Sequence, residues 1–448
     1  MKASNAYGVG GVEMKSVVSK EHVLSPQHVA IVGLGYVGLP LALLSRSKGH
    51  IVSGIDISLR RRELIKTASV PDLEDIQIAS LKKEPLSVSE EYTAIDTADV
   101  IIICVPTPVD GDRNPDLTPV TSACEAVGAH LKEGQLVVLE STVHPGTCEE
   151  IMIPILEKAS GLKVGKDFGV AHCPERINPG DTYWSVSRIP RVIGAYDKKT
   201  LAKASAFYRS ILDALVYEMG SLREAEAVKV VENSFRDINI AFVNELAMSF
   251  TKLNIDVVNV LEGAATKPFG FMLHSPGVGV GGHCIPVDPY YLIRYASQNG
   301  FSHQFLSLAR SINEQMPEFT ASLTEKALKQ NDIDINGATV ALLGISYKPN
   351  ISDLRESPSF ELLHALKEQG ATVRTFDPHV SEHSSVKSLE EALGGADVAI
   401  VATAHQEFVE LTPETFLKHN VPVVIDGRNC LDKEQFVASG ITYRGIGR

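Results

Sequence analysis

The sequence predicts an α/β protein in which two doubly wound, parallel-sheet domains are joined by a central helical domain. Near both ends of the chain, short apolar runs alternate with helical segments, which is typical of strands buried in a parallel sheet. The runs near the C-terminus repeat, in order, those near the N-terminus. Between them, Ala225–Leu253 is mostly free of Gly and Pro and is apolar at helical spacing, so we expect one long helix there.

In the N-terminal part, the apolar run at 28–32 stops at a glycine and predicts a first buried strand. A helix is expected from Pro40 to near Gly49, and three further strands at 51–55, 98–105 and 136–140. This alternation predicts a Rossmann-like, doubly wound sheet.

The C-terminal runs match these strands one by one, at 340–343, 373–377, 396–401 and 423–426. This second Rossmann-like sheet lacks a complete glycine motif, so we expect it to hold a different ligand or none. The predicted division of the chain is a flexible extension at 1–25, a dinucleotide-binding domain at 26–220, a helical domain at 221–330 and a second Rossmann-like domain at 331–448.

Charge, cysteine spacing and hydropathy argue against several classes of protein. A formal charge of −13 over 448 residues argues against general nucleic-acid binding, although it does not exclude an anionic ligand. The six cysteines show no CxxC spacing, which speaks against a zinc motif and a disulfide framework and favours reduced thiols in a cytoplasm. No apolar run reaches the ~18–20 residues of a membrane span, and residues 1–25 carry no signal-peptide core. We therefore predict no metal, no membrane and no nucleic-acid partner.

The first strand leads into Gly33-Leu34-Gly35-Tyr36-Val37-Gly38 and then into a predicted helix. In this G-x-G-x-x-G pattern the glycines allow a tight turn, close approach of a pyrophosphate and close packing of helix on strand. Asp56, at the end of the second strand, suits the ribose hydroxyls of NAD. Three arginines follow closely at 60–62, and we expect them to form a solvated helix face rather than a site for the 2′-phosphate of NADP.

A glycine-rich loop precedes one cysteine, in Gly281-Gly282-His283-Cys284. The glycines permit close approach to the thiol, so Cys284 is the candidate nucleophile. Asp288 precedes Pro289 and is expected to cap a helix, a role that can coexist with proton transfer. On the long helix, Lys229 and Asn233 share a face, where a cation and an amide could stabilise an oxyanion.

Taken together, these motifs resemble those of the UDP-glucose/GDP-mannose dehydrogenase family over about residues 27–445. The resemblance rests on the glycine motif, on Lys229 with Asn233, and on ordered segments that match the family at 104–108, 140–147, 174–180, 281–288, 344–349 and 353–357. It implies an NAD-dependent, four-electron oxidation of a sugar nucleotide at C6, for polysaccharide precursor synthesis.

The resemblance also implies residue roles. Cys284 would form the thiohemiacetal and thioester, Lys229 and Asn233 would stabilise oxyanions, and Asp288, Thr142 and Glu175 would handle protons and hydrolysis. The cofactor would contact Gly33, Gly35, Tyr36, Val37, Gly38, Asp56, Pro106, Thr107, Ser141 and Thr142. The UDP-sugar would contact Glu175, Arg176, Lys229, Asn233, Gly281, Lys348 and Arg355. The family's dimers imply a homodimer through the central helices.

Two departures from UDP-glucose dehydrogenases favour one branch of the family. Pro179 stands where those enzymes have a second Glu, and His283 stands where they usually have Ser. Pro-Glu-Arg at 174–176, Gly-Gly-His-Cys at 281–284 and Pro-Phe-Gly at 268–270 resemble the branch that acts on UDP-N-acetylhexosamines. UDP-N-acetylmannosamine is slightly favoured over UDP-N-acetylglucosamine, and UDP-N-acetylgalactosamine stays open.

Three alternatives also stay open. The chain could be a UDP-glucose or GDP-mannose 6-dehydrogenase. It could be a two-electron dehydrogenase of the 6-phosphogluconate type, which needs no thiol. It could also be a non-catalytic protein that senses nucleotides.

Overall fold

The computed structural model describes residues 25–71, 73–111, 113–177 and 184–448. The predicted extension, apart from Ser25, and Pro179 lie outside these residues. Contacts within the chain divide it into two compact units. The N-terminal unit comprises the described residues up to Glu232 together with Tyr290–Phe301, and the C-terminal unit comprises Asn233–Pro289 together with Ser302–Arg448. The predicted three-domain boundaries stay a prediction.

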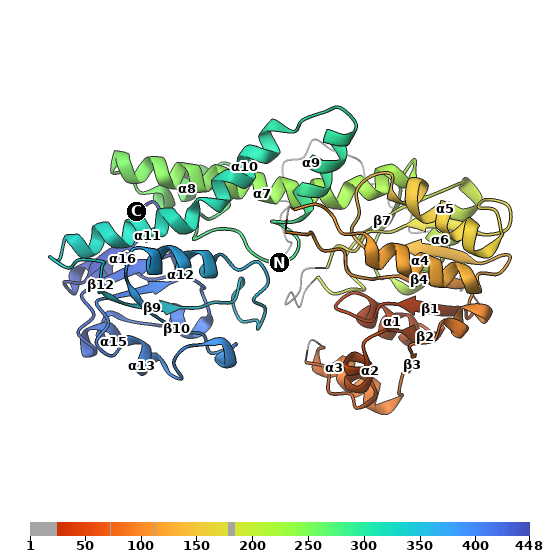
Figure 1. Ribbon diagram of the computed structural model, residues 1–448, viewed down its shortest axis with the longest axis horizontal. Helices are drawn as coiled ribbons and strands as arrows, with labels where there is room; N and C mark the ends of the chain where they lie inside the picture. Colours follow the sequence, from red (N-terminus) through yellow and green to blue (C-terminus); the bar gives the residue numbers. More distant parts are fainter. Residues whose placement is uncertain (1–24, 72, 112, 178–183) are drawn as a thin grey trace. The chain divides into compact units, whose positions relative to one another are not determined.

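The N-terminal unit contains an eight-stranded sheet of order β3-β2-β1-β4-β5-β6-β7-β8 (Figure 1). Its strands are β1 (His28–Val32), β2 (Ile51–Ile55), β3 (Ser87–Ser89), β4 (Val100–Ile103), β5 (Leu136–Leu139), β6 (Gly169–His172), β7 (Arg191–Ala195) and β8 (Val216–Glu218). The predicted parallel, doubly wound sheet is confirmed for β1, β2, β4 and β5, whereas β7 runs antiparallel to β6, which the sequence did not indicate.

Both faces of this sheet are covered because the strand side chains alternate between two buried apolar clusters. One cluster packs under α1 (Gly38–Ser47) and α6 (Lys198–Ile211), the other under α4 (Thr118–His130) and α5 (Ile153–Ser160). This unit also contains α2 (Leu59–Lys66) and α3 (Asp75–Lys83), with a 3₁₀ turn η1 (Tyr92–Thr97) and a π turn η2 (Cys148–Met152).

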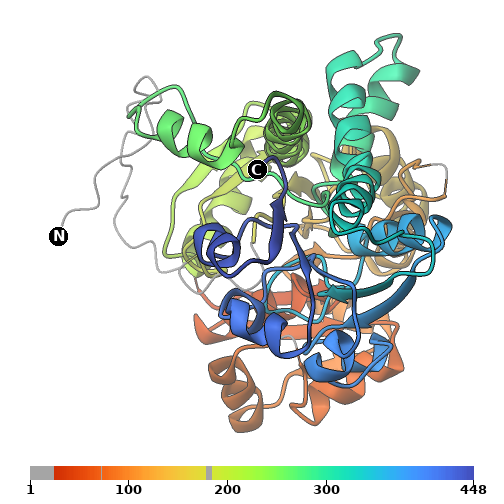
Figure 2. The same cartoon turned by 90° about the vertical axis from the view of Figure 1, so that its left-hand side faces the viewer.

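The C-terminal unit contains a five-stranded parallel sheet of order β10-β9-β11-β12-β13. The sequence predicted the first four of these strands along the chain, in a Rossmann-like sheet. The strands are β9 (Thr339–Leu343), β10 (Thr372–Phe376), β11 (Val398–Val401), β12 (Val423–Asp426) and β13 (Thr442–Gly445). Helices α11 (Met316–Lys329) and α12 (Pro358–Glu368) cover one face, and α13 (Leu389–Leu393) and α15 (Pro413–Lys418) lie on the other (Figure 1). Figure 2 turns this unit toward the viewer.

The C-terminal unit also contains α8 (Val257–Ala265), α10 (Gln304–Glu314), α14 (Gln406–Val409) and α16 (Lys433–Ala438), with a 3₁₀ turn η3 (Ser381–His383).

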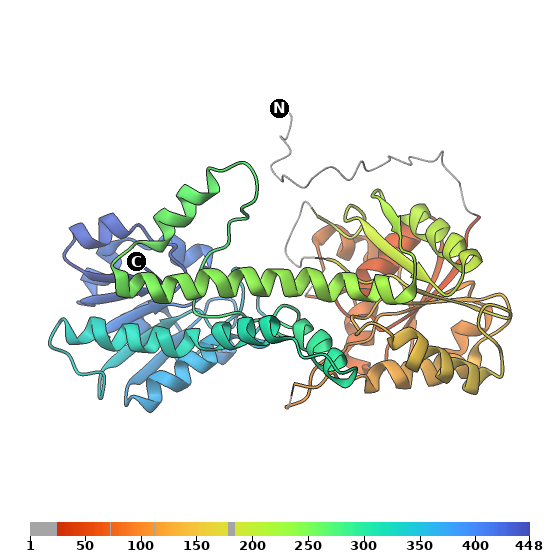
Figure 3. The same cartoon turned by 90° about the horizontal axis from the view of Figure 1, so that it is seen from above.

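The predicted long helix is α7 (Leu222–Leu253), which is unbroken over its 32 residues (Figure 3). Its first turns belong to the N-terminal unit and the rest to the C-terminal unit, and α9 (Asp288–Gln298) also has residues in both. Among the described residues, no helix combines the length and the apolar character needed to cross a bilayer.

Candidate active site

The turn between β1 and α1 has the geometry of a dinucleotide site. Gly33 has φ +89°, and a Cβ on it would lie 2.7 Å from the carbonyl oxygen of Cys104. A Cβ on Gly38 would lie 1.9 Å from the carbonyl oxygen of Gly33. By contrast, a Cβ on the exposed Gly35 would meet nothing within 4 Å. The outer glycines are therefore needed for packing, and the middle one leaves the helix N-terminus open to a phosphate.

Asp56 follows β2 at the same edge of the sheet, because Val32 and Ile55 are paired in register. Its two carboxylate oxygens accept hydrogen bonds from the backbone N–H groups of Leu34 and Ser58, both at 2.8 Å. These bonds fix the carboxylate beside the glycine turn, where it can accept from ribose hydroxyls.

The arginines after Asp56 were expected to form a solvated face, and this is wrong for one of them. Arg62 is buried, donates to the carbonyl oxygen of Asp56 at 2.7 Å and pairs with Glu90 at 2.6 Å. Arg61 donates through Nε to the carbonyl oxygen of Leu34 at 2.7 Å, and Arg60 is exposed. Arg62 therefore serves the fold, and the residues around the turn fit NAD.

The loops after β4 and β5 supply the other predicted cofactor contacts. Pro106 is exposed and Thr107 partly buried, and the hydroxyl of Ser141 donates to the carbonyl oxygen of Val105 at 2.7 Å, tying the two loops together. Thr142 is partly buried. Because Ile103 and Leu139 are paired in register, both loops leave the sheet at the edge that carries Asp56.

Lys229, on α7, lies against the segment that follows β6. Its ammonium group donates to the backbone carbonyl of Glu175 at 2.6 Å and lies 3.2 Å from the Glu175 carboxylate. The other carboxylate oxygen of Glu175 is buried and has no hydrogen-bond partner among the described residues. Arg176 is held by Glu232 and by the carbonyl oxygen of Pro190.

A buried ion pair supports this segment, and the sequence reasoning missed it. Glu140 and Arg191, both buried, lie 3.3 Å apart, and the hydroxyl of Tyr208 donates to Glu140. Arg191 also donates to the carbonyl oxygen of Pro174 at 3.2 Å. Burial raises the pKa of the Glu140 carboxyl, and Arg191 opposes the shift. Glu140 lies in a family motif, but nothing in the spacing connects it to Arg191 and Tyr208.

In the C-terminal unit, the thiol loop (Gly281–Cys284) packs on the chain that follows β9. A Cβ on Gly281 would lie 2.6 Å from the carbonyl oxygen of Glu356, and one on Gly282 would lie 2.6 Å from the Tyr347 ring. The N–H of Gly282 donates to the carbonyl oxygen of Arg355 at 3.0 Å. The glycines thus allow the chain before Cys284 to lie directly against residues 347–356, which include Lys348 and Arg355, the two residues predicted to contact UDP.

Cys284 is partly buried, and its carbonyl oxygen accepts the N–H of Asp288 at 2.8 Å. Helix α9 begins at Asp288 itself, one position earlier than the predicted cap implies. The buried Asp288 carboxylate accepts a hydrogen bond from the amide of Asn233, so these two predicted residues lie together.

Lys348 is partly buried in the loop after β9, and Arg355 is exposed nearby in the chain. Arg355 donates to both carboxylate oxygens of Asp353, at 2.6 to 3.1 Å. Burial would raise the pKa of Asp353, but the hydrogen bonds from Arg355 outweigh it and hold this pKa below its usual value.

The structure therefore assembles two groups of predicted site residues. Within the N-terminal unit lie Gly33, Gly35, Tyr36, Val37, Gly38, Asp56, Pro106, Thr107, Ser141, Thr142, Glu175, Arg176 and Lys229. Within the C-terminal unit lie Asn233, Gly281, Cys284, Asp288, Lys348 and Arg355. Their individual roles stay predictions.

A glycine turn built for NAD and a second Rossmann-like sheet define an NAD-dependent dehydrogenase with an additional nucleotide domain. Three sequence profiles of one family match the chain: the NAD-binding domain at residues 27–212, the central domain at 223–315 and the UDP-binding domain at 341–433. The chain belongs to the UDP-glucose/GDP-mannose dehydrogenase family, and its cofactor is NAD, as predicted.

Relatives of known activity match over nearly the whole chain. UDP-N-acetyl-D-mannosamine dehydrogenase of Pyrococcus horikoshii is 38% identical over 430 residues, covering 94% of this chain and 99% of the relative. UDP-N-acetyl-D-glucosamine 6-dehydrogenase of Pseudomonas aeruginosa is 39% identical over 397 residues, covering 87% and 93%. A solved structure of the Pyrococcus horikoshii UDP-D-ManNAc dehydrogenase superposes with a TM-score of 0.87 at 36% identity, covering 94% and 99% of the two chains.

Proposed function

We propose that this dehydrogenase oxidises the C6 hydroxyl of a UDP-N-acetylhexosamine to the uronic acid, for the synthesis of surface polysaccharide precursors. UDP-N-acetylmannosamine is the favoured substrate and UDP-N-acetylglucosamine the second candidate. The observation that carries the choice of substrate is the similarity to enzymes named for these two sugars, at 38% and 39% identity. Pro-Glu-Arg at 174–176 and His283 before the thiol point the same way.

NAD supplies the hydride acceptors when bound, one NAD molecule for each of the two oxidations. Gly33, Gly35 and Gly38 shape the turn that would hold its pyrophosphate, and Asp56 would accept from a ribose. Lys348 and Arg355 supply positive charge for the UDP phosphates. Arg355 is oriented by its pairing with Asp353, and its side chain is 47% exposed.

In the first oxidation, the C6 hydroxyl loses its proton to a water held by Asp288 and Lys229 as hydride leaves C6. The Cys284 sulfur then adds to the aldehyde carbon and the carbonyl oxygen takes a proton, which gives a thiohemiacetal. Lys229 and Asn233 stabilise the developing negative charge on that oxygen. A covalent bond at this point keeps the aldehyde from leaving the site.

Loss of a second hydride converts the thiohemiacetal into a thioester. Water, activated at Glu175 or Asp288, attacks the thioester carbon, and the thiolate leaves and is reprotonated. The unpaired, buried oxygen of Glu175 supports its role as the group that accepts the water proton.

The decisive experiment measures NADH released per sugar consumed with the full-length protein and a panel of UDP-N-acetylmannosamine, UDP-N-acetylglucosamine, UDP-N-acetylgalactosamine, UDP-glucose and GDP-mannose. Two NADH per sugar with an N-acetylated substrate is expected. One NADH per sugar would favour a two-electron dehydrogenase. A preference for UDP-glucose or GDP-mannose would overturn the substrate assignment.

The thiol step is tested by Cys284→Ser. This variant should start the reaction but release no uronic acid, whereas Cys430→Ser, at a partly buried cysteine of the same unit, should turn over normally. Full turnover by Cys284→Ser would exclude covalent catalysis.

We further propose a homodimer formed through the central helices, located in the cytoplasm. Phe235 and Phe242, seven residues apart on α7, share a face and are 47% and 51% exposed, a pattern that suits an interface. All six cysteines are free, which fits a reducing compartment. Light scattering of the full chain should give twice the 48.4 kDa chain mass, and Phe242→Glu should give monomers.

A further inference from the structure

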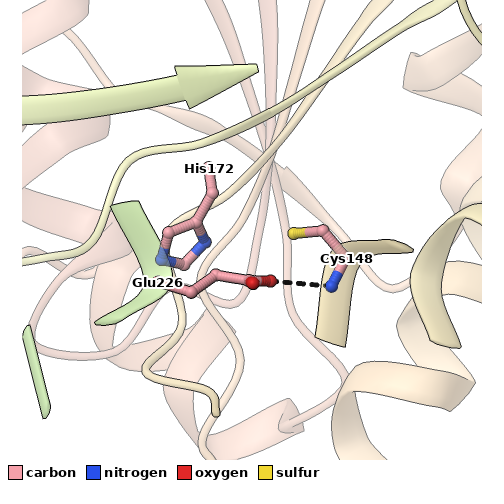
Figure 4. Close-up of side chains that lie close together, drawn as sticks. All are labelled: Cys148, His172 and Glu226. Atoms are coloured by element: carbon pink, nitrogen blue, oxygen red, sulfur yellow. Dashed lines mark hydrogen bonds between the residues drawn. The ribbon is translucent and has the colours of Figure 1, made fainter. Parts of the chain in front are cut away.

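A cluster of three polar side chains lies inside the N-terminal unit, apart from the residues assigned above. Cys148 begins η2, His172 ends β6 and Glu226 lies in the second turn of α7. Their thiol, imidazole and carboxylate atoms all lie within 4.8 Å of one another, and each side chain is fully or almost fully buried. Figure 4 shows the sulfur and the imidazole edge facing the Glu226 carboxylate.

Part of this cluster has a clear structural purpose. The two carboxylate oxygens of Glu226 accept the backbone N–H groups of Gly146 and Cys148, at 2.6 and 2.7 Å. These bonds satisfy free N–H groups where the chain enters η2. Each oxygen keeps a second acceptor position, since a carboxylate oxygen has two lone pairs.

His172 has no such explanation. It is 1% exposed, and neither of its ring nitrogens has a hydrogen-bond partner of normal geometry among the described residues. Leaving a buried polar group without a partner costs about 1–3 kcal/mol. A neutral imidazole keeps one ring nitrogen with a lone pair that can bind a cation.

We propose that Cys148, His172 and Glu226 bind a divalent transition-metal ion of the zinc class. One thiolate, one imidazole and one carboxylate are ligands that Zn²⁺ prefers. Two negative ligands would balance the charge of a divalent ion, which a fully buried site requires. The sequence offered no sign of this site because its ligands come from three distant segments, at 148, 172 and 226.

The location of the cluster indicates what such an ion would do. Each ligand lies a few residues from a group that the proposed reaction uses: Thr142 precedes Cys148, Glu175 follows His172 and Lys229 follows Glu226. An ion bound by all three ligands would link these segments and fix the relative positions of Thr142, Glu175 and Lys229. Its role would be to position these groups rather than to take part in the reaction. This positioning role rests on the proposed function, whereas the binding of the ion does not.

The test uses the full-length protein, produced with added Zn²⁺ or Co²⁺ and dialysed against metal-free buffer. Elemental analysis should find about one ion per chain. The Co²⁺ form should show a thiolate-to-metal charge-transfer band, and removing the ion should lower Tm reversibly. A wild-type protein that retains no ion, and whose Tm neither metal raises, would overturn the proposal.

Variants locate the site. Cys148→Ser and His172→Phe should lose the ion and the cobalt band, whereas Cys124→Ser, at an equally buried cysteine of α4 outside the cluster, should keep both. Equal metal content in Cys148→Ser would overturn the assignment. If these variants fail to fold, the wild-type band and Tm shift still decide. A protein that binds the ion but oxidises no UDP-sugar would refute the proposed function and leave the metal site intact.

Discussion

The ammonium group of Lys229 lies 3.2 Å from a carboxylate oxygen of Glu175, and these side chains are only 7% and 12% exposed. The pair joins the start of α7 to the segment that follows β6, while the second Glu175 oxygen has no partner among the described residues. A buried pair of this kind can contribute to stability, to catalysis or to both. Variants distinguish these cases, because a stability role changes the free energy of unfolding and a catalytic role changes kcat.

Lys229→Met should destabilise the protein by about 3 kcal/mol, because it leaves the Glu175 carboxylate buried and unpaired. It should also lower kcat by about 10²–10³-fold if the ammonium stabilises an oxyanion. Urea unfolding and steady-state NADH release measure the two effects.

The double variant Lys229→Met with Glu175→Gln isolates the stability role, because a neutral amide needs no cation. Most of the lost stability should return, while kcat stays low because both residues act in the proposed reaction. Recovery of kcat in the double variant would contradict a catalytic role for either residue.

Gly282→Ala should impair the thiol loop. Its φ of +90° is strained for alanine, and the new Cβ would lie 2.6 Å from the Tyr347 ring, so the loop before Cys284 must shift. A displacement of about 1 Å at a reacting group lowers turnover by about 100-fold.

Gly440→Ala is the matched control, because it has a φ of +87° in the same unit but open space around the new Cβ. Backbone strain alone costs about 1–2 kcal/mol, so both variants should lose some stability, but only Gly282→Ala should lose turnover. Equal turnover in the two variants would mean that the contact with Tyr347 does not position the thiol.

The sequence predicted those parts of the fold that local pattern controls. Buried strands such as β1 and β4 are continuous apolar runs, and α7 is a long stretch without helix breakers, so length and composition identify them. The antiparallel strand β7 was not predicted, because pairing direction depends on where the chain returns to the sheet rather than on the residues of the strand.

The same distinction applies to the site. The glycine turn with Asp56 and the loop with Cys284 are contiguous motifs, so the sequence displays them. By contrast, Glu140 with Arg191, and Cys148 with His172, are brought together only by the order of the strands. Arg62 was misjudged because its partner Glu90 lies 28 residues away.

Asp377 should contribute acid-sensitive stability. It occupies in the second sheet the place of Asp56 in the first, but it is fully buried and accepts from the N–H groups of Ile345 and Ser346, the Ser346 hydroxyl and His405. Burial would raise its pKa, but these hydrogen bonds outweigh it and hold the pKa well below the usual value. The ionised form is therefore favoured in the folded state.

A depressed folded-state pKa gives stability that is present above the unfolded pKa of about 4 and is lost as pH falls below it. Asp377→Asn should therefore cost about 1–3 kcal/mol at pH near 7 and progressively less below pH of about 4, as urea midpoints would report. Glu361→Gln, on the exposed face of α12, should change little. A constant difference between Asp377→Asn and wild type across this range would contradict the assignment.

Asp56→Ser should weaken NAD binding and leave sugar binding intact. Hydrogen bonds to a charged group contribute about 1.5–3 kcal/mol, so KM for NAD should rise by about 10–100-fold while KM for the UDP-sugar stays constant. NADP should not replace NAD, because Arg62, the buried arginine near the turn, already donates to Glu90 and to the Asp56 carbonyl oxygen. Adding Glu90→Gln releases one of these contacts, so the double variant should use NADP better than Asp56→Ser does. If Asp56→Ser alone accepted NADP as readily as NAD, the pairing of Arg62 with Glu90 would not be what excludes the 2′-phosphate.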